Sequence, residues 1–240
     1  GTLTYQWLSD GSAISGATNN TYTLTQSEVG KAISVTVSYT DDHGTEESIT
    51  SAQTSDVASV NNDPTGSVTI SGIAIQGAEL TADRSTLADE DGLGTLTYQW
   101  LSDESAISGA TSSTYTLTQS QVGKAISVTV SYTDDHGTEE SITSAQTGDV
   151  ANVNDDPTGS VTISGIAIQG AELTAVTNTL ADEDGLGTLT YKWLSDGSAI
   201  SGATSRTYTL TQSEVGKAIS ATVSYTDDYG AEESVTSAQT

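Results

Sequence analysis

The sequence predicts an all-β fold of tandem immunoglobulin-like antiparallel β-sandwich domains joined by short Asn/Asp-Pro linkers. The segment GTLTYQW begins at Gly1, recurs at Gly94 and returns as GTLTYKW at Gly187, so the chain repeats every 93 residues. Within a repeat, apolar residues alternate with Thr and Ser at period two, which is the signature of half-buried strands. A unit of this length is too long for a solenoid repeat and suits one small domain.

Each strand predicted in the middle repeat depends on this alternation and on β-branched residues, which disfavour a helix. We expect strands over residues 67–70, 78–82, 96–100, 114–117, 126–132 and from 141 to about 150. Six or seven short strands with a Trp on the third are typical of an immunoglobulin-type sandwich. That residue, Trp100, and its equivalents Trp7 and Trp193 are in phase with the core, so we expect packing rather than a sugar platform.

The domain boundaries are predicted from the only two prolines of the chain, Pro64 and Pro157, which stand among Asn, Asp and Gly. These are turn and linker residues, and they define a first linker (residues 58–66) and a second linker (residues 151–159). The predicted domains are a partial repeat over 1–60 with strands C to G, a complete repeat over 61–153, and a nearly complete repeat over 154–240. A frame offset from these boundaries is the alternative.

The charge balance excludes several classes of partner. Six Lys and Arg stand against 32 Asp and Glu, which gives a net charge of −26. Nucleic acid and anionic lipid surfaces would repel such a chain, so we expect neither as a partner. The absence of Cys excludes a disulfide framework and a thiolate site. No apolar run approaches the length of a membrane span. We expect an acidic protein that works outside the cell.

The acidic residues gather in two loops and in the linkers. In an immunoglobulin-type sandwich the B–C and F–G loops meet at one pole, which is also where the linker enters. Segments that are distant in sequence should therefore converge there. The candidate metal ligands at these places are Asp63, Asp89, Asp91, Asp134 and Asp135 at the first junction, and Asp155, Asp156, Asp182, Asp184, Asp227 and Asp228 at the second.

Electrostatic repulsion makes this clustering informative. Two carboxylates about 6 Å apart repel by roughly 0.7 kcal/mol at the dielectric of water and about 3 kcal/mol at a dielectric of 20. Either the side chains point into solvent as ordinary Asp-Gly turns, or a cation lies among them. Oxygen ligands without Cys favour Ca²⁺, which tolerates irregular coordination. We therefore predict structural Ca²⁺ at the junctions and no catalytic residues.

Several motifs together resemble a known family. The segments VANVNDDPTG, GAELTA, ADEDGLGTLTYQWLSD, GATSSTYTLTQ and VGKAISVTVSYTDDHGTEES are similar to tandem immunoglobulin-like repeats of giant RTX-type surface adhesins of Gram-negative bacteria, which act in biofilm formation. The resemblance covers the whole chain. It implies a linker role for Asp63, Asp155 and Asp156, and a loop role for the carboxylates that follow: Asp89, Asp91, Asp134, Asp182, Asp184 and Asp227. The glycine-rich calcium nonapeptides of such adhesins are absent from this segment.

The family resemblance implies an extender, a stalk that projects a distal ligand-binding domain from the cell surface and that calcium stiffens. The expected partners are the neighbouring repeats of the same chain, with no nucleic acid, no direct membrane contact and no small-molecule substrate, and the expected state is monomeric. An enzyme is not expected, because the acids occupy short turns and no deep cleft is indicated. A carbohydrate-binding or homophilic adhesive module of a secreted protein is the alternative.

Overall fold

The computed structural model describes residues 1–240 and is all-β, with antiparallel sheets and three short 3₁₀ turns. None of its helical segments is long or apolar enough to cross a membrane. The contacts divide the chain into two compact units, which are described separately. The first comprises residues 1–71, 81–113 and 127–146, and the second comprises residues 72–80, 114–126 and 147–240.

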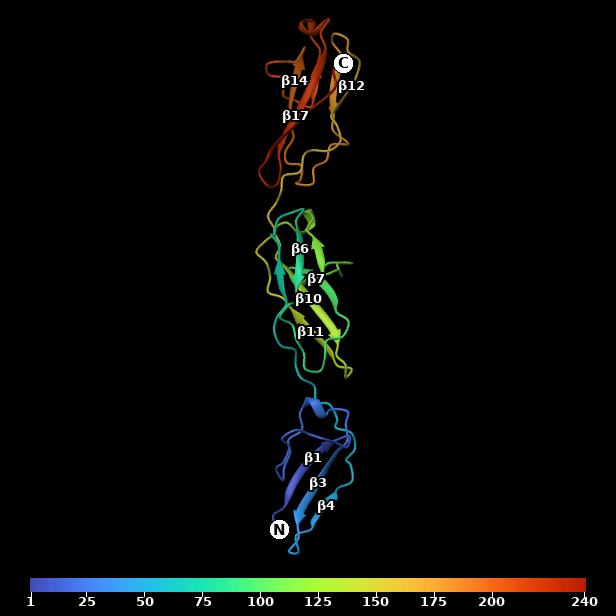
Figure 1. Ribbon diagram of the computed structural model, residues 1–240. Helices are drawn as coiled ribbons and strands as arrows, with labels where there is room; N and C mark the ends of the chain where they lie inside the picture. The colour runs from blue at the N-terminus through green and yellow to red at the C-terminus, as the bar shows by residue number, and fades with distance from the viewer. The chain divides into compact units, whose positions relative to one another are not determined.

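In the second unit, residues 157–240 form a two-sheet sandwich (Figure 1). One sheet has the order β12-β13-β16 and the other the order β15-β14-β17-β18. The predicted immunoglobulin-type, all-β fold class is thus confirmed. The bounds are β12 (Thr162–Ser164), β13 (Glu172–Val176), β14 (Thr190–Ser195), β15 (Ser198–Ala199), β16 (Thr207–Thr209), η3 (Gln212–Glu214), β17 (Ile219–Thr226) and β18 (Glu232–Thr236).

The same elements recur earlier in the chain at the 93-residue period. The first unit contains a sheet of order β2-β1-β3-β4, and the middle repeat has sheets β11-β10-β7-β8 and β5-β6-β9. Their bounds are β1 (Thr4–Ser9), β2 (Ser12–Ala13), η1 (Gln26–Glu28), β3 (Ile33–Thr40), β4 (Glu46–Thr50), β5 (Thr69–Ser71), β6 (Glu79–Asp83), β7 (Thr97–Ser102), β8 (Ser105–Ala106), β9 (Thr114–Thr116), η2 (Gln119–Gln121), β10 (Ile126–Thr133) and β11 (Glu139–Thr143).

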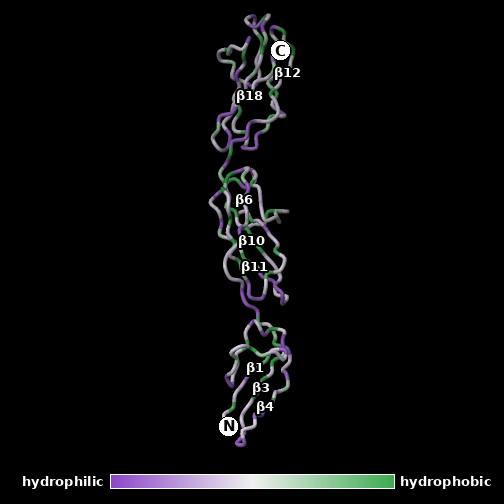
Figure 2. The backbone as a smooth tube through the Cα atoms, viewed as in Figure 1, coloured by the Kyte–Doolittle hydropathy of each residue, from purple (hydrophilic) through white to green (hydrophobic).

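The alternation in the sequence becomes the two faces of each sheet. Along β17, Ala221, Val223 and Tyr225 are buried while Thr222 and Ser224 are partly exposed. Successive strand residues point to opposite faces, so one face can be apolar and the other hydroxylated. On the hydroxylated face, Thr222 pairs with Thr236 and their hydroxyls lie 2.8 Å apart. Figure 2 shows hydrophobic residues along the strands and hydrophilic ones in the loops.

The core of the third repeat surrounds Trp193, whose side chain is fully buried and whose indole N–H donates to Ser205 O at 3.0 Å. Trp100 is equally buried, so the predicted core role is confirmed for both residues. Trp7 is half-buried, and its indole N–H donates to Asn19 O at 2.9 Å. The core around Trp193 is formed by Leu173, Ala175, Ala203, Leu210, Ile219 and Ala221.

Two predicted strand ends are wrong. The final strand of the middle repeat, expected to continue to about residue 150, ends at Thr143. The chain beyond it keeps only isolated pairings, such as the parallel bridge between Val122 and Val150. The strand expected over residues 67–70 lies at Thr69–Ser71. Period-two alternation fixes which face a residue occupies, but it does not fix where pairing stops.

The turn between β7 and β8 contains a strained residue. Asp103 and Glu104 have φ of 45° and 66°, whereas the equivalent turns place Gly11 and Gly197 at the second position, with φ of 79° and 78°. We predict that Glu104→Gly raises the free energy of unfolding by roughly 1 kcal/mol, since a side chain in the left-handed region costs about 1–2 kcal/mol. Urea denaturation measures the change. Glu104→Ala is the control, because it keeps a Cβ and should gain nothing.

The 3₁₀ turns predict a pH effect. Glu28 is buried, and its carboxylate accepts hydrogen bonds from Ser27 and Thr25, which lower its pKa to about 2. This stabilisation is complete above the ordinary glutamate pKa and is lost as the pH falls toward 2. The middle repeat has Gln121 at this position, with the same contacts to Thr118. Glu28→Gln should therefore lose less unfolding free energy between pH 6 and pH 2.5 than the parent. An equal loss in both proteins would contradict this expectation.

Candidate functional site: the repeat junctions

The two acidic loops of the middle repeat lie in contact, as their placement in the sequence predicts. The Asp135 backbone N–H donates to Asp91 O at 3.1 Å. Gly92, with φ of 98°, lies so close to Asp135 that a side chain there would collide with its carboxylate. Glycine is therefore favoured at this position by the backbone conformation, and a side chain there would also displace the Asp135 carboxylate. The first unit thus brings the loops at residues 89–92 and 134–137 together.

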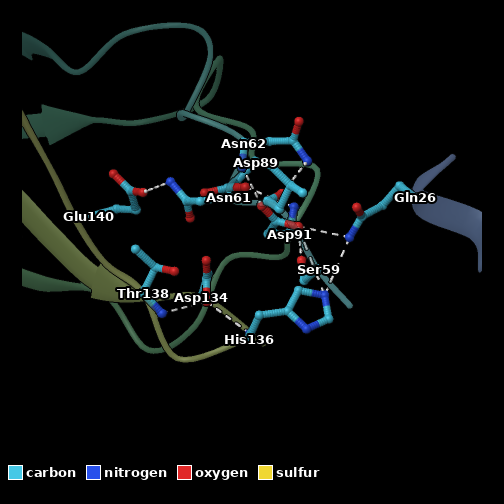
Figure 3. A network of polar contacts seen from close by, with 11 residues as sticks. Gln26, Ser59, Asn61, Asn62, Asp89, Asp91, Asp134, His136, Thr138 and Glu140 are labelled. Carbon is cyan, nitrogen blue, oxygen red and sulfur yellow. Dashed lines mark hydrogen bonds and ion pairs between the residues drawn. The ribbon is translucent and has the colours of Figure 1, made fainter. Parts of the chain in front are cut away.

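Asp91 is the centre of the first junction (Figure 3). Its side chain is almost completely buried, and it accepts hydrogen bonds from two other segments, the first linker and the 3₁₀ turn η1. The backbone N–H of Asn62 lies 2.5 Å from Oδ2, Ser59 Oγ lies 3.3 Å from Oδ1, and Gln26 Nε2 lies 2.8 Å from Oδ1. The hydrogen bond from the Asn62 backbone is the main cause of a lowered pKa at Asp91. The first linker and a 3₁₀ turn therefore converge on one carboxylate.

Asp89 and Asp134 shape the loops around this centre. Asp89 accepts the Tyr132 hydroxyl at 2.6 Å and the Asp91 backbone N–H at 2.8 Å. Asp134 Oδ1 accepts the backbone N–H groups of His136 and Thr138, each at 2.8 Å. Its bond from Thr138 is the main cause of a lowered pKa at Asp134. The other oxygen, Asp134 Oδ2, is buried and has no hydrogen-bond partner.

The second unit repeats this arrangement at the second linker. Asp184 is buried and accepts the Asp155 backbone N–H at 2.7 Å and Gln119 Nε2 at 2.9 Å. Its own carbonyl accepts the Asp228 backbone N–H at 3.1 Å. The equivalents of Asp89 and Asp134 also keep their contacts. Asp182 accepts the Tyr225 hydroxyl at 2.6 Å, and Asp227 Oδ1 accepts two backbone N–H groups while Oδ2 has no partner.

Three kinds of junction residue were missed by the sequence reasoning. Gln26 and Gln119 reach the central carboxylates from 65 positions away. Gln76 contacts the second linker through Asp155 Oδ2 at 2.6 Å. Glutamates beside the F–G loop accept linker amides, from Asn61 to Glu140 at 2.8 Å and from Asn154 to Glu233 at 2.9 Å. Almost every residue recurs at the 93-residue period, exposed ones included, so recurrence alone could not have singled these residues out.

The predicted ligands do not all take part. Asp63, Asp135, Asp156 and Asp228 are exposed, and no group of three or more His, Asp or Glu side chains closes into an arrangement that could hold a metal ion as it stands. The buried oxygens nevertheless fit a hard cation in kind, because several have no hydrogen-bond partner: Asp134 Oδ2, Asp227 Oδ2, Gln119 Oε1 and Asn152 Oδ1. Carboxylate and amide oxygens are typical Ca²⁺ ligands. The calcium assignment stays a prediction.

No protein-family model matches the chain, and no curated protein matches it significantly. Among solved structures, the chain is similar to a Ca²⁺-stabilised adhesin that helps an Antarctic bacterium reach out and bind ice, with 15% identity, a TM-score of 0.35, and coverage of 99% of this chain and 64% of the other. A 1.5-MDa bacterial ice-binding adhesin gives 14% identity, a TM-score of 0.32 and coverage of 99% and 85%. A titin fragment gives 13% identity, a TM-score of 0.28, and coverage of 98% of this chain and 87% of the other. At these scores the similarities carry no functional inference.

Proposed function

We propose that the chain is a spacer segment from the stalk of a Gram-negative bacterial cell-surface adhesin, placed outside the cell, and that its task is to hold repeats in series. The observation that carries this proposal is the pair of buried carboxylates, Asp91 and Asp184, each bound by a linker N–H and by a glutamine from an earlier loop. Two copies of one junction indicate a part that is built by repetition.

The junctions explain how such a spacer would be stiffened. A buried carboxylate costs free energy unless hydrogen bonds or an opposite charge compensate it. Asp91 and Asp184 have neutral donors only, apart from His136, whose Nε2 lies 3.8 Å from Asp91 Oδ1. Ca²⁺ would supply the missing positive charge, held by the unpartnered oxygens of Asp134 and Asp227 together with neighbouring loop and linker oxygens. In this proposal, bound calcium fixes each linker to the loops beside it.

The near identity of the repeats supports a mechanical role over recognition. A recognition surface gains little from being copied, whereas a spacer gains length with each copy. The surface grooves are repeated as well. Equivalent polar grooves of about 450 Å³ and 400 Å³ lie on the sheets of the middle and third repeats. These grooves are lined mainly by Thr, Ser and Glu. A distal ligand-binding domain and its ligand are part of the proposal.

Homophilic adhesion is the competing function, and it predicts self-association. We expect the chain to remain monomeric in a concentration series by sedimentation velocity, because a charge of −26 opposes association of identical chains. The measurement should be made in EDTA and again in millimolar calcium, at physiological ionic strength. A sedimentation coefficient that rises with concentration in calcium would favour adhesion between repeats over the spacer.

Calcium should raise the melting temperature through the two junctions. A site that is filled at a free calcium concentration about 100-fold above its Kd adds roughly 2.7 kcal/mol to the free energy of unfolding. The double variant Asp134→Asn, Asp227→Asn removes two anionic ligands while keeping an acceptor for the loop N–H groups. We expect it to lose most of the calcium-dependent rise, as measured by differential scanning calorimetry with and without EDTA.

The first repeat offers a matched control for this experiment. Asp41 accepts the same two loop N–H groups, from His43 and Thr45, each at 2.8 Å. Unlike Asp134 Oδ2 and Asp227 Oδ2, Asp41 Oδ2 is not among the buried oxygens without a hydrogen-bond partner. Asp41→Asn should therefore leave the calcium response unchanged. An equal reduction by Asp41→Asn would assign the response to general charge screening rather than to the junctions, and no calcium response in the parent would end the calcium proposal.

A further inference from the structure

The two linkers differ in sequence at two positions beside the central carboxylates. The first linker contains Ser59 and Asn62, where the second contains Asn152 and Asp155. The second linker thus has an amide in place of a hydroxyl and a carboxylate in place of an amide. Because Ca²⁺ binds carboxylate and carbonyl oxygens, these differences affect how strongly each junction can hold the ion.

The residue at the first of these positions has different contacts in the two units. Ser59 Oγ donates to Asp91 Oδ1 at 3.3 Å, so its hydroxyl is paired with the carboxylate. Asn152 is partly buried, and its side-chain Oδ1 is buried without a hydrogen-bond partner. A buried acceptor that lacks a donor costs free energy, and a cation would compensate it. Asn152 therefore offers an unpaired oxygen ligand where Ser59 offers a hydroxyl that is already paired.

Backbone contacts hold Asn152 in place on both sides. The Ala151 backbone N–H donates to Ala74 O at 2.9 Å, and the Val153 backbone N–H donates to Gln76 Oε1 at 3.1 Å. The turn that contains Ala74 and Gln76 thus fixes the second linker without the help of an ion. The rigidity of a site is one of the factors that set its calcium affinity.

The residue at the second position adds a charge beside the buried aspartate. The Asp155 backbone N–H donates to Asp184 Oδ2 at 2.7 Å, and Asp155 Oδ2 accepts Gln76 Nε2 at 2.6 Å. Asn62 makes the same backbone contact with Asp91, but its side chain is neutral. Calcium affinity depends on the number of charged ligands as well as on rigidity. The second linker therefore brings one more negative charge to its junction than the first.

Two further unpaired oxygens border Asp184. Gln119 Nε2 donates to Asp184 Oδ1 at 2.9 Å, which places the same amide beside the carboxylate, and Gln119 Oε1 is buried without a partner. Asp227 is 6% exposed, and its Oδ2 is likewise unpaired. The next residue, Asp228, donates its backbone N–H to Asp184 O at 3.1 Å. All of these residues belong to the second unit, so a linker, a 3₁₀ turn and a loop of one unit supply the unsatisfied oxygens.

We propose that Asn152 and Asp155 are calcium ligands that set the affinity of the second junction, so that this junction fills at a lower calcium concentration than the first. The inference rests on the proposed calcium-stiffened spacer and adds an order to it. As the calcium concentration rises, the second linker is fixed by the ion while the first still lacks it. The rigidity of the chain then increases in steps rather than at one threshold.

Nuclear magnetic resonance of the isotope-labelled full chain follows the two junctions separately in one calcium titration, with a chelator to buffer the free ion. The backbone N–H groups of Asn62 and Asp155 are the reporters, because each donates to the central carboxylate of its own junction. We expect the midpoint at Asp155 to lie at a calcium concentration about tenfold or more below the midpoint at Asn62.

Exchanging the two linker positions gives the decisive comparison, because each variant is compared with the parent at the same junction. The double variant Asn152→Ser, Asp155→Asn should raise the midpoint of the second junction by about tenfold or more. Ser59→Asn, Asn62→Asp tests the same positions in the opposite direction and should lower the midpoint of the first junction by a similar factor. Asp156→Asn is the matched control, since it removes an exposed charge from the second linker. It should shift the midpoint by less than about threefold, because solvent and salt screen an exposed charge.

Three results would overturn the proposal: one common midpoint for both junctions, an exchange that leaves the midpoint of its own junction unchanged in a folded chain, or an equal effect of Asp156→Asn. Circular dichroism in EDTA verifies the fold of each variant. In all three cases the junctions still bind calcium, so the proposed function stands. A chain in which neither reporter responds to millimolar calcium would instead reject the calcium proposal as a whole.

Discussion

The junctions of this protein depend on one interaction, a buried aspartate that accepts a backbone N–H from the linker. Asp91 and Asp184 occupy this position in the two units. A buried charge needs several donors, and the structure recruits them from segments that are far apart in sequence. The requirement explains why the linker lies against the loop at residues 89–92, and why a glutamine from a 3₁₀ turn reaches the other oxygen of the same carboxylate.

The sequence was sufficient to predict the architecture and the convergence of the acidic loops. Alternation places Val128, Val130 and Tyr132 on the buried face, and the loops meet because the topology places them at one end of the sandwich. It was insufficient to predict how the carboxylates are satisfied. Gln26 and Gln119 have no local pattern that indicates an acidic partner 65 residues later, because such contacts depend on how a linker docks.

The few positions at which the repeats differ serve as natural substitutions. They show which side chains the shared structure requires and which it does not. Glu28 and Glu214 become Gln121 in the middle repeat without loss of the capping contacts, so these contacts need an acceptor that can be charged or neutral. Gly11 and Gly197 become Glu104, which retains a left-handed backbone at a cost. His136 becomes Tyr229, although both donate their backbone N–H to the same kind of aspartate. The loop conformation therefore depends on the aspartate, and it tolerates either a His or a Tyr side chain at the second position after it.

Near identity between repeats leaves few core residues to tell the folding chain which strand belongs to which sheet. β6 and β13 both begin with Glu-Leu-Thr-Ala, so each could add to the sheet of the other repeat. What favours the correct partner is its nearness along the chain, and closing a loop one repeat longer costs only roughly 1 kcal/mol more. The correct strands then pair because they meet faster, not because their pairing is much more stable. Exchange of strands between repeats is therefore the characteristic misfolding hazard of such a chain.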